Sequence, residues 1–345
     1  MIFIDVSTRN YLKVGWRAKI IGLGAYLPKR VLSNRDLEKM VETSDEWITS
    51  RTGMKERRLA AADEFTSDMG YEAAKRALED SGKGAEEIDF ILFATLTPDY
   101  LFPSTACLIQ ERLGAVNAAA MDMQAACTGY IYALSVAKAY VESGMYKNVL
   151  IVAAEKLSSI VNYEDRNTCV LFGDGASACV IGDRQKGLAI ENISLGSDGQ
   201  QSKLLILPAG GSKRPASLET VQAGEHFLRM EGREVFKHAV RRMEGALKEC
   251  LAASDLDQQG ISWMVPHQAN VRIIEALAKR FKVPKERVYL TIHKYGNTSA
   301  SSVGIALDEL VREKNVRSGE RIALFAFGAG LTWGATSLTY EVDNG

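Results

Sequence analysis

Short apolar runs recur along the first half of the chain and alternate with amphipathic stretches. The runs at 88–98, 118–124 and 148–156 are rich in Ile, Leu, Val, Phe, Ala and Met and are bounded by polar or turn residues. Continuous apolar runs of this length are typical of parallel strands buried on both faces. We therefore predict three such strands within the first half.

The amphipathic stretches between these runs carry helix start and stop signals. The stretch from Thr66 has Thr66 or Ser67 as a candidate N-cap and Gly82 as a candidate stop, and the next two stretches end at Gly114 and Gly144. Strands and helices that alternate in this way favour a layered α/β fold.

The second half of the chain echoes the first. The segment 173–183 resembles 332–342, because each runs from Gly-Ala and a hydroxyl residue into an alternating strand pattern. Apolar runs in both halves also follow a helix and an acidic loop. We predict an internal duplication, with halves at 18–186 and 187–345 and a join near 184–200. The polar region 196–225 is interpreted as a loop or excursion.

Composition narrows the class of protein. The 345 residues carry 42 basic and 43 acidic side chains, so no global charge points to nucleic acid or an anionic membrane. Residues 1–17 form neither a signal peptide nor an anchor and are expected to be an N-terminal extension, and no run of 18 apolar residues occurs. Five scattered cysteines and four histidines, without a C-x-x-C pair, predict a reduced, cytoplasmic protein without a metal site.

Cys127 stands where a predicted strand meets a predicted helix, in the segment "DMQAACTGYIYAL". Unpaired N–H groups at a helix N-terminus favour a thiolate, lower the cysteine pKa and can hold an oxyanion. The small Thr128 and Gly129 leave room for a substrate. Local sequence leaves a second interpretation equally open, in which Cys127 packs as a small hydrophobic residue.

Two further polar residues follow predicted strands in the second half. His267 follows "ISWMV" and precedes a predicted helix, whose N-terminus would keep the imidazole neutral and able to donate to a carbonyl. Asn297 precedes a run of small residues that begins another helix, and its amide can donate to the same carbonyl. Taken alone, His267 is also explained as a structural histidine and Asn297 as a turn residue.

A glycine-rich turn at Gly328, Ala329 and Gly330 follows the run "IALFAF" and can offer a backbone N–H to an oxyanion. Alone it is weak evidence, since tight turns need glycine and the spacing is not that of a dinucleotide fingerprint. Sites in open α/β sheets gather where strands end. A cysteine, a histidine and an asparagine at three such ends therefore indicate chemistry more strongly than each does singly.

Several motifs, in order, closely resemble the β-ketoacyl-acyl carrier protein synthase III family, the condensing enzymes that initiate bacterial type II fatty acid synthesis. The resemblance spans about Ala18 to Ser337. The motifs that carry it are "SDEWITSRTGMKERR", "DMQAACTGYIYAL", "FGDGASA", "MEGREVFKHAV", "PHQAN", "GNTSASS" and "FGAGLTWGA". It implies a thiolase-like fold, two duplicated α/β halves in a five-layer αβαβα arrangement, usually as a homodimer.

The resemblance assigns a catalytic triad to Cys127, His267 and Asn297. It implies that Cys127 accepts an acyl group from acyl-CoA, and that His267 and Asn297 stabilise the enolate formed when malonyl-acyl carrier protein loses CO₂. Elongating relatives use Cys-His-His, and thiolases use a second cysteine near the C-terminus. Here no cysteine follows Cys250, which matches the initiating class. No cofactor is implied, since acyl-CoA is a substrate.

The oxyanion hole is expected at the backbone N–H groups of Cys127 and Ala329. Alanine at 329 departs from the glycine of the family pattern, which puts the loop conformation in doubt but keeps the backbone donor. Arg233 replaces a polar asparagine of the family and is not carried over as a site residue.

The resemblance also implies substrate contacts. The expected CoA-binding residues are Thr43, Trp47, Arg51, Arg166 and Asn270, with Trp47 and Arg166 on either side of the adenine. Phe102 occupies the position that closes the acyl pocket, and its bulk predicts a short primer, with acetyl as the expected one.

Because carrier proteins are acidic, docking is expected on basic side chains of two helices, Lys237 with Arg241 on one, and Arg272, Lys279 and Arg280 on the other. An ordinary solvated face is the alternative interpretation of these charges.

Three rival functions remain at this stage. One is a related condensing enzyme of secondary metabolism with another primer or acceptor. The second is a papain-like cysteine hydrolase, which the strand–helix rhythm, the internal echo and the absence of a Cys-Trp motif disfavour. The third is an acyl-CoA-binding module without catalysis, which has no need of His267 and Asn297 together.

Overall fold

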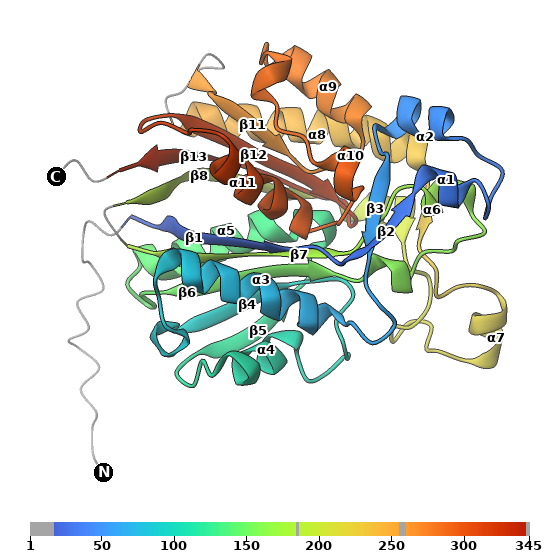
Figure 1. The fold of residues 1–345 in the computed structure, drawn as a ribbon, viewed down its shortest axis with the longest axis horizontal. Coiled ribbons are helices and arrows are strands. Elements are labelled where there is room, and N and C mark those ends of the chain that lie inside the picture. Colours follow the sequence, from blue (N-terminus) through green and yellow to red (C-terminus); the bar gives the residue numbers. More distant parts are fainter. Residues whose placement is uncertain (1–16, 184–185, 255–259, 343–345) are drawn as a thin grey trace.

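The computed structural model describes residues 17–183, 186–254 and 260–342. The predicted extension 1–17 lies outside these residues except for Arg17. A mixed sheet of nine strands runs through the described molecule in the order β11-β12-β13-β8-β1-β7-β6-β4-β5 (Figure 1). Its strands are β1 (Lys19–Tyr26), β4 (Phe90–Ala94), β5 (Ala119–Met123), β6 (Val149–Glu155), β7 (Gly175–Gly182), β8 (Gly187–Ser197), β11 (Trp263–Pro266), β12 (Arg321–Gly328) and β13 (Thr332–Glu341).

The strand order repeats outward from the centre. On one side β1, β7, β6 and β4 follow one another, and on the other β8, β13, β12 and β11 do. The first three strands of each set pair antiparallel and the last pair is parallel. This symmetry is what the echo between the two halves of the sequence predicts. The boundary between residues 186 and 187 itself stays a prediction.

The two halves are joined narrowly. β1 and β8 pair only through Lys19 and Ile20. The two halves of the sheet diverge beyond these residues, and helices fill the space between them (Figure 1). The principal helices are α3 (Thr66–Ser81), α4 (Thr105–Leu113), α5 (Gly129–Glu142), α8 (Gly232–Ala253), α9 (Val271–Arg280) and α11 (Ser301–Glu313).

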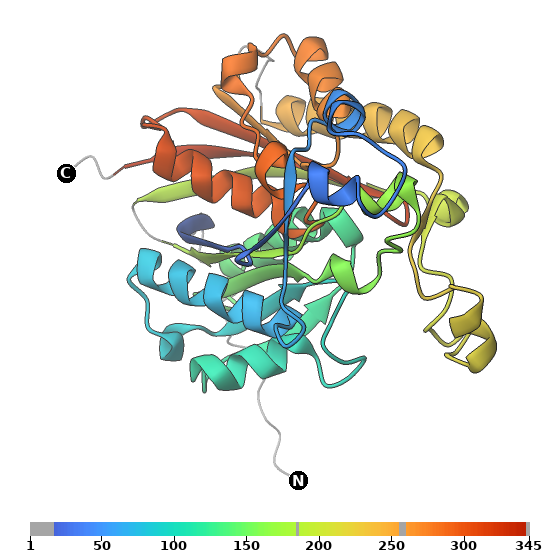
Figure 2. The ribbon, with the colours of Figure 1, turned by 45° about the vertical axis from the view of Figure 1, so that its right-hand side comes forward.

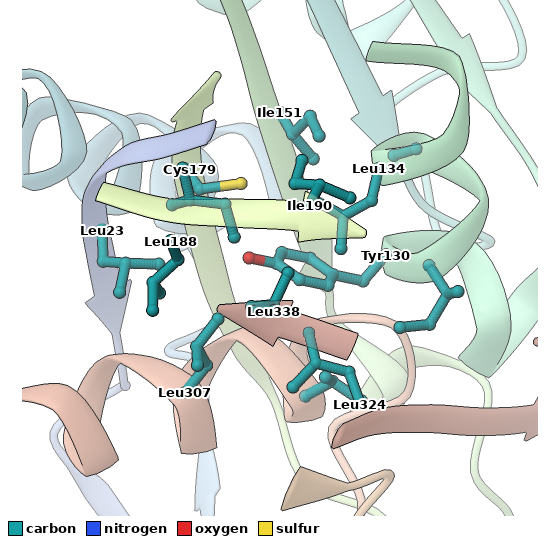
Figure 3. Close-up of a cluster of buried hydrophobic side chains, with 14 of the residues drawn as sticks. Leu23, Tyr130, Leu134, Ile151, Cys179, Leu188, Ile190, Leu307, Leu324 and Leu338 are labelled. Atoms are coloured by element: carbon teal, nitrogen blue, oxygen red, sulfur yellow. The ribbon is translucent and has the colours of Figure 1, made fainter. Parts of the chain in front are cut away.

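Three buried apolar clusters define the layers. One joins α3 and α4 to the first half of the sheet, and another joins α8 and α9 to the second half. The largest contains α5 and α11 between strands of both halves. Figure 3 shows this central cluster, in which Tyr130 of α5 lies among side chains that include Leu324, Leu338 and Cys179. The order of layers is therefore αβαβα, and the predicted five-layer fold is confirmed.

A smaller lobe covers one end of these layers. It consists of α1 (Asn34–Leu37), α2 (Asp45–Thr52), α6 (Arg166–Cys169), α10 (Ile292–Tyr295) and two small antiparallel sheets. One sheet pairs β2 (Arg30–Ser33) with β3 (Glu56–Leu59), and the other pairs β9 (Leu205–Ile206) with β10 (Arg229–Met230). The predicted excursion carries α7 (Leu218–Gln222), which projects from the body in both views (Figure 2). No helix among the described residues is long and apolar enough to cross a membrane.

Two local predictions need correction. β5 is not buried on both faces, because it forms the edge of the sheet and its side chains are half-buried or exposed. Helix α3 begins at Thr66 after Phe65, so neither Thr66 nor Ser67 is the N-cap. Asp68 accepts from the Phe65 N–H and provides the cap instead, while Thr66 donates to Thr97. The predicted stop at Gly82 is confirmed.

Candidate active site

Cys127 lies on a single 3₁₀ turn, Ala126–Thr128, that connects β5 to α5. The preceding Ala126 has a φ of 45°, an unusual value for a residue with a Cβ, so the backbone turns sharply here. Only 6% of Cys127 is exposed. The junction between strand and helix predicted from the sequence is therefore present, and the thiol is both buried and at the start of a helix.

The predicted low pKa of Cys127 is wrong for this arrangement. Burial raises the pKa of the Cys127 thiol to about 12, and the nearby Glu155 carboxylate raises it further, although a hydrogen bond from Ser299 opposes both effects. A dry pocket disfavours the thiolate more strongly than the helix start favours it. A nucleophilic role for this thiol would therefore need a neighbouring group to take up its proton.

The end of β12 approaches the Cys127 turn closely. A Cβ on Gly328 would lie 2.8 Å from the Cys127 nitrogen and 3.1 Å from the Thr128 nitrogen, so only glycine fits. Thr332 holds the two segments together by donating to the Ala125 carbonyl and contacting the Thr128 hydroxyl. Within the described residues, the N–H groups of Cys127 and Ala329 donate to no backbone carbonyl. Both therefore remain able to donate to an oxyanion.

His267 follows β11 and is 4% exposed. Its Nδ1 lies 2.6 Å from the Ser302 hydroxyl, and the same hydroxyl accepts from the Gln268 N–H at 3.3 Å. Because Ser302 accepts from Gln268, its own proton can be donated to Nδ1, and in that tautomer the ring proton is on Nε2. Burial lowers the pKa of His267 to about 3. The predicted neutral imidazole is confirmed, with burial rather than a helix start as its cause.

Asn297 lies in the turn before α11. Its Oδ1 accepts from the Ser299 N–H at 2.8 Å, and its backbone bridges to Phe172 and Leu171. This Asx turn fixes the side-chain oxygen and leaves Nδ2 as the group that faces outward from the turn. Asn297 can therefore act as a turn residue through Oδ1 and still offer its Nδ2 to a carbonyl, so the two interpretations from the sequence do not exclude each other.

The three side chains line one pocket of about 100 Å³. Apolar residues of α8 and β12, among them Val235 and Phe327, complete its wall. A larger chamber of about 460 Å³ meets the pocket at Cys127 and Phe172, and is lined mainly by apolar side chains such as Leu96 and Leu207. Cys127 thus lies where the small, mainly apolar pocket that also contains His267 and Asn297 meets the larger apolar chamber, and Ala329 lines the chamber.

Of the predicted nucleotide contacts, three basic or aromatic side chains come together. Arg166 and Arg51 lie with their guanidinium carbons 5.0 and 5.2 Å from the Trp47 ring centroid. Asn270 caps α9, donates to the Arg51 carbonyl, and also lines the small pocket that contains Cys127. The Thr43 hydroxyl is buried without a hydrogen-bond partner in the described chain. Asn270 therefore connects the Trp47 group to the pocket of Cys127.

The predicted docking side chains are exposed, but several are already paired. Arg272 donates to the Ser50 carbonyl beside the Trp47 group. Lys237 pairs with Glu234, and Arg280 pairs with Glu244 across α8 and α9. Of the set, Arg272 is the basic group nearest to the nucleotide residues, and Arg280 is partly neutralised.

Phe102 does not line either pocket of its own chain. It is 85% exposed, next to Leu101, which is 87% exposed. The prediction that Phe102 closes the acyl pocket is therefore not met within one chain.

Three residues of the site carried no signal on their own in the sequence. Ser302 orients His267, Ser299 orients Asn297 and contacts Cys127, and Glu155 lies behind Ser299. The hydroxyl-rich segment "GNTSASS" was the only available signal for the two serines. In the sequence, Glu155 ends an apolar run and resembles an ordinary solvent-exposed residue at a strand end. Only the folded structure shows that it is buried.

The five-layer fold defines a class of thiolase-like enzymes, and comparisons with known proteins agree. Family models described as 3-oxoacyl-[acyl-carrier-protein (ACP)] synthase III and its C-terminal part match residues 121–199 and 251–340. The β-ketoacyl-[acyl-carrier-protein] synthase III of Chlamydia muridarum is 61% identical over 93% of this chain and 99% of its own. That of Caldanaerobacter subterraneus is 54% identical over 94% and 98%.

Solved structures give the same result. The 3-oxoacyl-[acyl-carrier-protein] synthase III of Aquifex aeolicus superposes with a TM-score of 0.86 at 49% identity, over 94% of this chain and 100% of the other. The priming β-ketosynthase of the R1128 polyketide pathway gives 0.87 at 36% identity, over 96% and 98%. The chain belongs to the β-ketoacyl-[acyl-carrier-protein] synthase III family, and is therefore an enzyme of the acyltransferase class.

Proposed function

We propose that Cys127, His267 and Asn297 are the catalytic residues of this condensing enzyme, which initiates type II fatty acid synthesis. The observation that carries the proposal is their position around one pocket, with the thiol between two hydrogen-bond donors and an apolar chamber. A module that only binds acyl-CoA needs the chamber but not the two donors.

In the first half-reaction the Cys127 sulfur attacks the carbonyl carbon of a short acyl-CoA. The negative oxygen of the tetrahedral intermediate accepts from the N–H groups of Cys127 and Ala329, and CoA leaves as its thiolate. The acyl chain then occupies the apolar chamber. Loss of one such oxyanion donor raises the barrier by about 3 kcal/mol.

In the second half-reaction malonyl-acyl carrier protein places its thioester oxygen near the two donors. The Nε2–H of His267 and the Nδ2–H of Asn297 stabilise the enolate that forms as the carbon–carbon bond to CO₂ breaks. A neutral imidazole suits this role, because it donates a hydrogen bond to the enolate oxygen without transferring its proton to the enolate. The enolate carbon attacks the acyl carbon, and the bond between that carbon and the Cys127 sulfur breaks. The 3-oxoacyl product is released on the carrier protein, and Cys127 is left as a thiolate.

We propose that the nucleotide of CoA is held by Trp47, Arg51 and Arg166, and its pantetheine arm by Asn270. Stacking on a ring flanked by guanidinium groups suits adenine. Thr43 stands beside them with an unused hydroxyl.

We further propose a homodimer in which Phe102 of each copy closes the acyl chamber of the other. The support is an exposed apolar loop at Leu101 and Phe102 together with the exposed sheet edge at β5. Closure by this aromatic side chain limits the primer to a short chain, with acetyl as the expected substrate. Equal or faster reaction of longer acyl-CoA than of acetyl-CoA in steady-state assays would contradict the short-primer proposal.

Carrier-protein docking is proposed at Arg272, supported by Lys237, Lys279 and Arg280. A cytoplasmic location is proposed because the five cysteines are free and only Cys107 is exposed. A role in priming secondary metabolism is the second candidate function, since one similar structure is a priming β-ketosynthase of a polyketide pathway.

The proposal is tested by an assay with acetyl-CoA and malonyl-acyl carrier protein, in which acetoacetyl product and CO₂ are followed. We expect activity in the native protein and none above background in Cys127→Ser. Equal product from this variant rejects the assignment. Preference for a different acceptor or a longer primer favours the priming role in secondary metabolism.

A further inference from the structure

Glu155 is a fully buried carboxyl group directly behind the nucleophile. It ends β6 and has no exposed surface. The main groups that favour its ionised form are neutral donors, two threonines, one backbone N–H and Ser299, rather than a cation. Burying an ionised carboxylate among neutral groups costs free energy of folding unless the carboxylate takes up a proton. A buried acid beside Cys127 is therefore a candidate for a functional role.

The two oxygens of Glu155 are unequally satisfied. Oε2 accepts from the hydroxyls of Thr95 and Thr97 at 3.0 and 2.8 Å, and from the N–H groups of Leu96 and Thr97 at 3.1 and 3.2 Å. Oε1 accepts from the Ser299 hydroxyl at 3.1 Å and shares the Leu96 N–H at 3.3 Å. Oε1 is therefore the oxygen with capacity for a proton, and it faces Ser299.

The threonine hydroxyls are fixed in direction, whereas Ser299 is not. Thr95 accepts from the Thr97 N–H, and Thr97 accepts from the Lys156 N–H, so each donates its own proton to Glu155. The Ser299 hydroxyl donates to Glu155 Oε1 at 3.1 Å, a hydrogen bond from Ser299 also lowers the pKa of the Cys127 thiol, and Ser299 and Cys127 line the same chamber. The hydroxyl can therefore accept from one of these two groups and donate to the other.

Ser299 is also held in place with some strain. Its φ is 52°, in the region that disfavours side chains with a Cβ, and its N–H is bonded to Asn297 Oδ1. The same residue thus fixes the Asn297 amide and bridges the acid to the thiol, in a wall of the acyl chamber.

We propose that Ser299 and Glu155 form a proton relay that takes up the thiol proton of Cys127 during acylation and returns it after condensation. As the sulfur–carbon bond forms, the thiol proton moves to Ser299 Oγ and the Ser299 proton moves to Glu155 Oε1. CoA leaves as a thiolate and takes a proton from solvent. After condensation, the released Cys127 thiolate regains its proton from Glu155 by the reverse path, so the cycle balances.

The ionisation properties of the neighbours agree with this geometry. Burial raises the pKa of Glu155 to about 7, which makes it a competent acceptor near neutral pH, whereas the pKa of His267 is lowered to about 3. The charged or titratable groups near Glu155 in the described chain include Cys127, the adjacent Lys156 and Asp174, which directly precedes β7. Lys156 Nζ is bonded to the carbonyls of Ala61 and Glu64, and Asp174 to Ser158.

The relay predicts a pH dependence with a definite sign. Below the pKa of Glu155 the acceptor is already protonated, so acylation is slow, and the rate rises through about pH 7 as Oε1 becomes free. Single-turnover acylation by acetyl-CoA, followed by release of the CoA thiol between pH 5.5 and 9, measures this rise without a carrier protein.

We expect Glu155→Gln to slow acylation at pH 8 by about 100-fold and to abolish the rise near pH 7, since general-base assistance contributes about that factor. Ser299→Ala, which keeps the carboxyl group and its other donors, gives the same loss of the rise and keeps the test valid if Glu155→Gln does not fold. Asp308→Asn removes another buried carboxyl group, on α11, and retains the wild-type profile.

An unchanged rise near pH 7 in either relay variant, or acylation of Glu155→Gln at the wild-type rate or faster, overturns the relay. The inference rests on the proposed role of Cys127, and the two fail separately. Acyl label found on Cys127→Ser rejects the proposed function, whereas normal labelling of Cys127 with unchanged pH profiles rejects only the relay.

Discussion

At the scale of single residues, a hydroxyl sets the direction in which His267 donates. Ser302 accepts from Gln268 and can donate its own proton to Nδ1, an arrangement in which the Nε2 proton is available to a substrate. Ser302 lines neither the pocket nor the chamber that Cys127 lines, so we expect it to affect only one of the two half-reactions. Under the proposed mechanism, enolate stabilisation would depend on Ser302 and formation of the acyl-enzyme would not.

We expect Ser302→Ala to reduce condensation about tenfold, the effect of one lost hydrogen bond of about 1.4 kcal/mol, with acylation unchanged. Single-turnover acylation and steady-state condensation measure the two steps separately. Ser301→Ala is the matched control, because the neighbouring buried hydroxyl donates to the Thr298 carbonyl instead. Normal condensation by Ser302→Ala would show that His267 needs no such orientation.

Gly328 tests the proposed oxyanion hole. An added Cβ lies 2.8 Å from the Cys127 nitrogen, which forces the two N–H donors apart. We expect Gly328→Ala to lower the acylation rate by about 100-fold, as the loss of an oxyanion donor does. Gly245→Ala, in α8 with open space around its Cβ, is the control and keeps full activity. An active Gly328→Ala variant with unchanged thermal unfolding places the oxyanion elsewhere.

At the scale of elements, α2 and α9 meet where the nucleotide residues and the proposed docking residues adjoin. Arg272 on α9 donates to Ser50 of α2, and Asn270 donates to Arg51. The carrier protein and CoA are thus expected to approach the same mouth, but to depend on different side chains.

Charge reversal at Arg272 separates these substrates. We expect Arg272→Glu to raise the KM for malonyl-acyl carrier protein about tenfold and to leave single-turnover acylation by acetyl-CoA within about twofold, because an acidic partner is repelled and steered away. Lys75→Glu, on α3 in the opposite outer layer, serves as the charge-reversal control. Equal loss in both reactions rejects docking at Arg272.

The sequence pattern was sufficient to predict most helices and strands. It was insufficient to predict which other elements each of them packs against. The predicted ends of α3 and α4 at Gly82 and Gly114 hold, because a glycine in the left-handed region is a local requirement. The position of β5 at the sheet edge is not set by local sequence, because residues 118–124 do not determine how many strands pair with β5.

The same distinction applies to the site. Cys127, His267 and Asn297 follow strands and could be selected from the sequence, whereas the pKa of Cys127 depends on how tightly distant segments cover it. Glu155 could not be selected from the sequence, because its proposed role depends on contacts with residues 60 and 144 positions away along the chain.

At the scale of the whole molecule, the proposed homodimer would use the exposed apolar loop at Leu101 and Phe102 and the sheet edge at β5. Leu101→Asp places a charge in the proposed interface, and we expect the dimer to dissociate at micromolar concentration. Light scattering coupled to size exclusion measures the mass. Met145→Asp, at an exposed apolar residue outside this loop, should leave the dimer intact. A dimeric Leu101→Asp variant, or a monomeric wild type, contradicts the proposed interface.

The duplicated architecture explains how three distant residues share one pocket. β5 and β11 deliver Cys127 and His267 from separate halves, and the turn before α11 delivers Asn297 from the second half. The narrow join at Lys19 and Ile20 lets the central helices pass between the halves, so that their starts face the same region.

The most direct test of this account is intact-protein and peptide mass spectrometry after mixing with acetyl-CoA. The account predicts one acetyl adduct on the peptide that contains Cys127, and its loss on addition of malonyl-acyl carrier protein as acetoacetyl product appears. Cys127→Ser should show no stable adduct. An acetyl group on another residue, or an adduct at Cys127 that malonyl-acyl carrier protein never discharges, would contradict the claim that Cys127 carries the acyl group through the condensation.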